Sequence, residues 1–163
     1  GTPFRHLVDH GVIRAEHLVQ IGIRGYWPFP EEFAWARDAG VRWHRMEQVM
    51  TDGIDAVVDE VLGEVSSAQH LFLSVDVDVL DPAYAPGTGT PEPGGMTTRE
   101  LLRAVRSLVL ARGLVGMEVV EVSPPYDHAQ ITAMAAHRVV LEALAALAVE
   151  RSARGPEPET PHR

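Results

Sequence analysis

The chain has 163 residues, with 14 Lys and Arg against 23 Asp and Glu, a formal net charge of -9 and no cysteine. This length suits one domain with a sizeable core, and the negative charge without a Lys/Arg cluster argues against a nucleic-acid or anionic-membrane partner and favours a small cationic ligand. The absence of cysteine excludes disulfide and thiol chemistry, and we expect no membrane span, no signal peptide near Gly1 and a cytoplasmic location.

Strand and helix patterns alternate along the chain, which predicts βα units and a parallel sheet. Runs of apolar residues predict the strands, at residues 18–23, 41–44, 71–75 and 114–122.

Helical spacing of apolar residues predicts the helices between and after these strands. The helices are expected at residues 31–39, ended by Gly40, along 54–65, from a capping box of Thr97 and Glu100 to Gly113, and at about 130–151. We therefore expect a single α/β domain over residues 1–151 and a short disordered tail at 152–163.

Two carboxylates follow the apolar run at residues 71–75, which is typical of a strand buried on both faces of a sheet. Asp76 and Asp78 stand at positions i and i+2, and in a strand such side chains share one face about 6.6 Å apart. Because two unpaired carboxylates in an apolar setting repel each other, a hard divalent cation stabilises them, and oxygen ligands favour Mg, Ca or Mn. We predict a metal site here, with Asp81 shaping the turn before Pro82 rather than binding metal.

The segment 82–95 holds eight prolines and glycines in fourteen residues. A linker would have this composition, but the segment lies between a predicted buried strand and a predicted capped helix. We therefore expect an ordered active-site loop.

The pattern SxDxDxxDPxxxPGTGTPxxGG, which begins at Ser74, resembles the ureohydrolase family of arginases and agmatinases. The resemblance covers nearly everything before about Val149 and extends to GTPF at 1–4, VQIGIRG at 19–25, GMEVVEVSPPYD at 116–127 and ITAMAA at 131–136.

The resemblance implies a three-layer α/β/α fold with a parallel sheet, of which the N-terminal part is missing. It also implies two Mn(II) ions, with Asp76 bridging both and Asp78 binding one. Glu121 would be the catalytic residue that binds the substrate guanidinium. Glu118 lies three residues earlier on the same predicted strand and therefore on its opposite face. Whether Glu118 supports the site from behind stays open. The resemblance further implies a homo-oligomer, a trimer or hexamer.

The four other metal ligands of the family lie in an HxDxHxD segment, which these 163 residues lack. We therefore read the chain as the C-terminal part of a larger enzyme that converts agmatine and water to putrescine and urea, in polyamine metabolism, and expect this part alone to be inactive. The alternative is a noncatalytic truncated homologue or an assembly-dependent fragment. A glycosyltransferase use of DxD is a third reading, without a nucleotide-binding signature to support it.

The sequence indicates the substrate less precisely than it indicates the family. Arginases of the family carry an acidic residue after the IGxR segment, whereas Gly25 follows Arg24 here. Agmatine, guanidinobutyrate or a related ω-guanidino acid therefore fits better than arginine. For Arg24 and Trp27, a role in shaping the pocket and an ordinary structural role both stay open.

Overall fold

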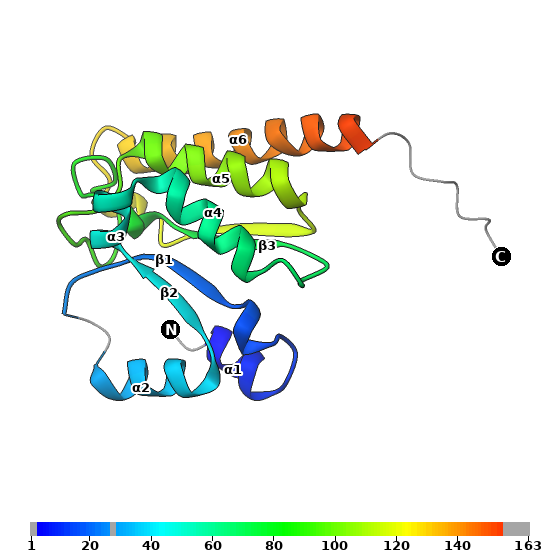
Figure 1. Cartoon of the computed structure of the whole chain (residues 1–163). Coiled ribbons are helices and arrows are strands. Elements are labelled where there is room, and N and C mark those ends of the chain that lie inside the picture. The colour runs from blue at the N-terminus through cyan, green and yellow to red at the C-terminus, as the bar shows by residue number, and fades with distance from the viewer. Residues whose placement is uncertain (1–2, 27–28, 155–163) are drawn as a thin grey trace.

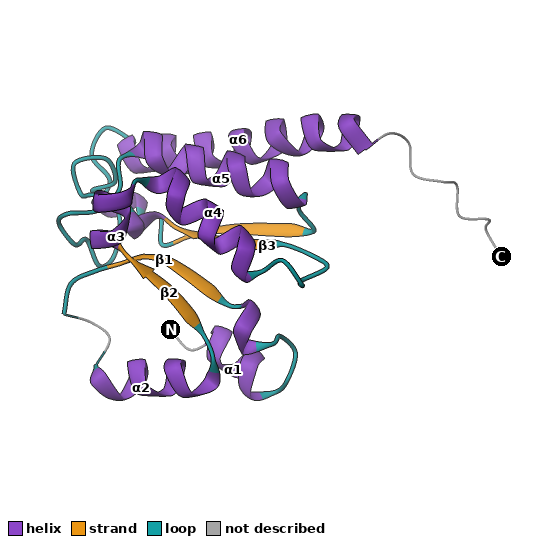
Figure 2. Ribbon diagram, in the orientation of Figure 1, coloured by secondary structure: helices purple, strands orange, loops and turns teal. Residues whose placement is uncertain are grey.

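The computed structural model describes residues 3–26 and 29–154, in which helices and strands alternate (Figures 1 and 2). The elements in chain order are α1 (Pro3–Asp9), η1 (Ala15–His17), β1 (Val19–Ile23), α2 (Pro30–Ala39), β2 (Arg42–Arg45), α3 (Met46–Asp52), α4 (Ile54–Glu64), β3 (Phe72–Asp76), η2 (Val77–Val79), α5 (Thr98–Arg112), β4 (Gly116–Val120), η3 (Pro124–Tyr126) and α6 (Ile131–Arg154).

The strands form two parallel pairs, which confirms the predicted parallel arrangement. In one pair Val19 of β1 lies opposite Arg42 of β2, and in the other Phe72 of β3 lies opposite Gly116 of β4. Among the described residues no strand joins the two pairs, so β1 and β3 each keep an unpaired edge.

The carboxyl ends of β1 and β3 nevertheless approach each other closely. Gly22 in β1 has a φ of 93°, and a Cβ on it would lie 2.5 Å from Cγ2 of Val79, just beyond β3. Only a glycine fits this contact, because any side chain meets both an unfavourable backbone conformation and a steric clash. The contact brings the VQIGIRG segment next to the Asp76 turn.

Helices α4, α5 and α6 lie on one side of β3, as Figure 1 shows. The capping box of Thr97 and Glu100 begins α5 as predicted. The core lies between these helices and the strand pair, and its most buried side chains include Val57, Val105, Val109 and Val139.

Burial on both faces of β3 was expected and is wrong for the described residues. Val75 is 4% exposed, but Phe72 is 53% exposed. Val75 belongs to the core that α4, α5 and α6 form. Figure 2 shows these helices on one side of β3 only.

The sequence patterns did not predict the helices α1 and α3. Helix α3 begins directly at the end of β2, and Gly53, with a φ of 85°, separates it from α4. The last helix continues to Arg154, three residues beyond the expected boundary, and residues 155–163 of the expected tail lie outside the described residues, as do Gly1, Thr2 and Trp27.

Helix α6 is long and apolar enough to cross a membrane by length and composition alone, contrary to the expectation that no such stretch exists. In the fold it packs along α5, with Val139, Ala143 and Ala146 buried in the core and Glu142 paired with Arg106 of α5. These contacts make α6 a part of the domain's own packing.

Candidate active site

Asp76 and Asp78 lie where β3 ends, but not on one strand face. Asp76 is the last residue of β3, and Asp78 lies in the 3-10 turn η2. The predicted strand spacing of their side chains is therefore wrong. Instead, Oδ1 of Asp76 accepts a 3.1 Å hydrogen bond from the main-chain N–H of Asp78, which folds the second carboxylate back beside the first.

Asp76 lies close to other acidic groups, and these groups change its pKa. The pKa of Asp76 is raised from 3.8 to about 6, first by burial and then by the negative charges of Asp78 and Glu121, against the lowering effect of the hydrogen bond from the Asp78 N–H. The carboxylates of Asp78 and Glu121, from the ends of β3 and β4, thus both act on Asp76 at the carboxyl edge of this strand pair.

Glu121 does not lie in a strand, as was expected, because β4 ends at Val120. Its φ of 65° is in the left-handed region, which is uncommon for a residue with a side chain and is found most often at functional sites. Oε2 of Glu121 lies 3.5 Å from the position that a Cβ on Gly89 would take, so the carboxylate faces the loop at 82–95.

The loop at 82–95 is ordered by contacts at both of its ends and in its middle. Asp81 accepts hydrogen bonds from the main-chain N–H groups of Ala83 at 2.9 Å, Gly94 at 2.7 Å and Gly95 at 3.3 Å. These bonds, first those from Ala83 and Gly94, hold the pKa of Asp81 below its usual range. Asp81 therefore shapes the turn, as predicted.

The middle of the loop lies against the start of α6. Gly87 donates to Oγ1 of Thr132 at 2.7 Å and accepts from the main chain of Ser123 at 2.8 Å. Asp127 accepts from the N–H groups of Thr132 and Ala133, both at 2.9 Å, and so caps α6. The loop connects the two aspartates to the segment that follows Glu121.

Sequence reasoning missed Thr90 as a contact of the site. Its hydroxyl donates a 2.8 Å hydrogen bond to Oδ2 of Asp78. The GTGT motif contains this residue, but the motif alone does not show which hydroxyl reaches an aspartate.

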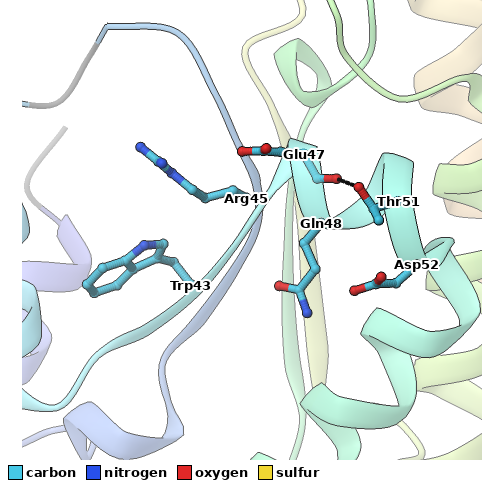
Figure 3. A pocket seen from close by; sticks show the side chains of 6 residues that line it. All are labelled: Trp43, Arg45, Glu47, Gln48, Thr51 and Asp52. Atoms are coloured by element: carbon cyan, nitrogen blue, oxygen red, sulfur yellow. Dashed lines mark hydrogen bonds between the residues drawn. The ribbon is translucent and has the colours of Figure 1, made fainter.

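The described residues contain no group of three or more His, Asp or Glu side chains placed to hold a metal ion. A hollow of about 410 Å³ lies elsewhere, on β2 and α3, and none of the three carboxylates lines it. Figure 3 shows the side chains that do. The lining residues are Trp43, Arg45, Glu47, Gln48, Thr51 and Asp52. We therefore keep Asp76, Asp78 and Glu121, and not this hollow, as the candidate site.

Comparison with known proteins identifies, over nearly the whole chain, the family that the motifs resemble. Residues 1–146 match the model of the Arginase family. The chain is 46% identical over 156 residues to guanidinopropionase of Pseudomonas aeruginosa, covering 94% of this chain and 48% of that protein. It is 43% identical over 144 residues to proclavaminate amidinohydrolase of Streptomyces clavuligerus, covering 88% and 46%.

Solved structures resemble the fold closely. Formimidoylglutamase from Bacillus subtilis matches with a TM-score of 0.85 and 38% identity, over 89% of this chain and 46% of that one. The proclavaminate amidino hydrolase structure matches with a TM-score of 0.82 and 41% identity, over 91% and 48%. The chain thus spans about half the length of the relatives it matches.

Proposed function

The chain belongs to the arginase family and has the arginase-like α/β fold, and from this premise we propose that the complete protein hydrolyses the guanidino group of a small linear compound. Hydrolysis breaks the bond between the guanidino carbon and the substituted nitrogen, with water oxygen going to carbon. The products are urea and an amine. The observation that carries this proposal is the meeting of Asp76, Asp78 and Glu121 at the ends of β3 and β4.

The crowded carboxylates fit a bound cation. Asp76 is half-buried with two other acidic groups acting on it, and among the described residues no Arg or Lys side chain pairs with any of the three. We propose that Asp76 and Asp78 hold two Mn(II) ions in the complete protein. Such ions, when bound, lower the pKa of water and supply a strong nucleophile near neutral pH.

Glu121 has the role of binding the substrate cation. A carboxylate accepts two parallel N–H bonds from a planar guanidinium, which fixes the plane of the reacting carbon. The left-handed backbone of Glu121 directs its side chain toward Gly89, where the lack of a side chain leaves room beside the carboxylate. Thr90 meanwhile keeps one oxygen of Asp78 in a fixed direction.

The remaining metal ligands have to come from another polypeptide segment. The family resemblance assigns four of them to an HxDxHxD segment, which is absent from this sequence. Strands β1 and β3 each have an unpaired edge among the described residues, so a further strand can pair there. We propose that the complete protein supplies this strand and assembles as a homo-oligomer.

Agmatine is the substrate we favour. Gly25 stands at the position where arginases carry an acidic residue, and a Cβ on it would lie 3.0 Å from Cδ of Glu92. Gly25 itself thus offers no carboxylate for the α-amino group of arginine, which favours agmatine over arginine.

An ω-guanidino acid is the second candidate, because guanidinopropionase is among the relatives with high identity and guanidinobutyrase of Pseudomonas aeruginosa is 37% identical. Agmatine and guanidinobutyrate are similar in length and carry opposite charges at the far end, so comparing their kcat/KM values separates the two candidates.

Urea release from agmatine, guanidinobutyrate, guanidinopropionate and arginine by the complete protein tests the proposal. Release of urea from at least one of these four compounds supports it. No urea from any of them, or hydrolysis of formimidoylglutamate alone, overturns it. A noncatalytic protein remains the alternative for a chain without HxDxHxD, and an upstream reading frame that lacks this segment would favour that alternative.

A further inference from the structure

The guanidinium of Arg24 is surrounded by main-chain carbonyl groups. Its Nη2 donates to the carbonyl oxygens of Asp78 at 2.7 Å, Leu80 at 3.2 Å and Glu92 at 2.6 Å. Its Nη1 donates to the carbonyl of Val79 at 3.3 Å, and its Nε donates to Glu92 at 3.1 Å. Every nitrogen of the side chain is therefore used by the protein's own backbone.

These carbonyls belong to two segments that flank the side chain of Asp78. Three of them follow one another at the end of the turn η2, where carbonyl groups lack partners within the turn and carry partial negative charge. The fourth, that of Glu92, lies in the loop whose Thr90 hydroxyl donates to Oδ2 of Asp78. The Arg24 guanidinium thus joins the turn that carries Asp78 to the loop that orients the Asp78 carboxylate.

We propose that Arg24 is a positioning residue for Asp78: it fixes the turn and the loop so that the carboxylate keeps the direction needed for a divalent cation. The proposal rests on the proposed function, because it takes Asp78 as a ligand. It also means that Arg24 is held by the main chain rather than by a carboxylate at the far end of the substrate, since each of its three nitrogens donates to a main-chain carbonyl.

The geometry of arginine suits this role. Its planar fork reaches several carbonyls at once, whereas a lysine ammonium is a point charge on a flexible stem. Residues that orient the ligands of a metal commonly change its affinity by about 10–100-fold when they are replaced. Replacing Arg24 should therefore weaken the binding of the metal cation and leave substrate binding unchanged.

The test compares Arg24→Met, Arg24→Lys and a matched control, Arg42→Met, in the complete protein freed of metal. Arg42 lies on the neighbouring strand β2, and its hydrogen bond goes to the carbonyl of Glu64, away from the Asp78 turn. Calorimetric titration with Mn²⁺ gives the dissociation constant of each variant, and steady-state kinetics at saturating Mn²⁺ give kcat and KM.

We expect the Mn²⁺ dissociation constant to rise about 10–100-fold in Arg24→Met, to rise less in Arg24→Lys, and to stay within about twofold in Arg42→Met. The KM for the guanidino substrate should stay within about threefold in all three, which distinguishes positioning of a metal ligand from substrate binding. If Arg24→Met does not fold, the Arg24→Lys measurement decides.

Two results overturn the proposal: wild-type Mn²⁺ affinity in both Arg24 variants, or a KM that rises at least about tenfold with unchanged Mn²⁺ affinity. The titration needs no substrate, so it still tests Arg24 if the wild-type protein releases no urea and the proposed function fails. If the wild-type protein binds no Mn²⁺, both proposals are overturned.

Discussion

Ser74 donates a 2.8 Å hydrogen bond from its hydroxyl to Oε1 of Glu118, directly across the pair of strands β3 and β4. Glu118 is therefore held on the sheet by a neighbouring side chain. Glu121, three residues later, has left the strand and faces Gly89 instead. The two glutamates lie in separate environments, and it is the negative charge of Glu121 that helps to raise the pKa of Asp76.

This difference predicts unequal effects of the same substitution. In the complete protein, Glu121→Gln should lower kcat/KM for the guanidino substrate about 100-fold, because a charge-assisted, two-pronged hydrogen bond to the cation is lost. Glu118→Gln keeps an oxygen that accepts from Ser74, so its kcat/KM should stay within about threefold of wild type. Urea release measures both, and an equal loss in the two variants would contradict the assignment of Glu121.

Asp76 makes the stability of the metal-free protein depend on pH. Its folded-state pKa of about 6 lies above the ordinary value of 3.8, so between these values the folded state holds more protons than the unfolded state. The stabilisation is fully present below about pH 4 and is lost as the pH rises through 6. Two pKa units correspond to about 3 kcal/mol at most, and solvent screening of this half-exposed group reduces the expected loss to about 1 kcal/mol.

Urea denaturation at about pH 5 and pH 7 measures this loss, with Asp76→Asn as the control. Every other side chain is common to both proteins, so the difference between them isolates Asp76. Asp81, with its lowered pKa, acts in the opposite direction and only below about pH 4. We expect wild type to lose more stability than Asp76→Asn between the two pH values. If the free energy of unfolding changed with pH equally in the two proteins, the pKa of Asp76 would not be raised.

Two glycines of the 82–95 loop should respond differently to alanine. A Cβ on Gly87 would lie 2.5 Å from Cβ and 2.6 Å from Cα of Asp127, which caps α6 and cannot move freely. Gly87→Ala should therefore lower the free energy of unfolding by about 1–3 kcal/mol.

Gly89→Ala is the matched comparison. Its new methyl group meets only Oε2 of Glu121, at an ordinary contact distance of 3.5 Å, so stability should change by less than about 0.5 kcal/mol. The methyl group does narrow the approach to the Glu121 carboxylate, and KM should rise. Equal melting temperatures of the Gly87 and Gly89 variants, or an unchanged KM in Gly89→Ala, would contradict this arrangement of the loop.

The features that sequence predicted well are local ones. The capping box of Thr97 and Glu100, the helix end at Gly40 and the strand before Asp76 depend on neighbours a few residues apart, and all are present. Asp76 and Asp78 were predicted as metal ligands from their spacing after an apolar run, and Glu121 was assigned through a resemblance of motifs, but neither signal shows how the three side chains come together.

What the sequence did not show depends on tertiary contacts and backbone conformation. Asp78 lies in a turn instead of a strand because residues 78–80 bind Arg24, which is 54 positions from Asp78 in the chain. Glu121 leaves its strand through a φ of 65°, which no local pattern marks. The exposure of Phe72 follows from which elements cover the sheet, and periodicity within one strand does not contain that information.

The 163-residue chain by itself should bind Mn(II) weakly, release no urea and be marginally stable. Asp76 and Asp78 offer at most four carboxylate oxygens, while a pair of Mn(II) ions needs about ten to twelve donors, so each ion would stay mostly hydrated. The unpaired edges of β1 and β3, with Phe72 53% exposed, also favour association between chains. Calorimetric titration with Mn²⁺, urea release and thermal unfolding of this chain, beside the complete protein as control, measure the three properties, and sedimentation measures the association. Two tightly bound Mn(II) ions per chain, or urea formed from agmatine by this chain alone, would show that its own residues complete the site.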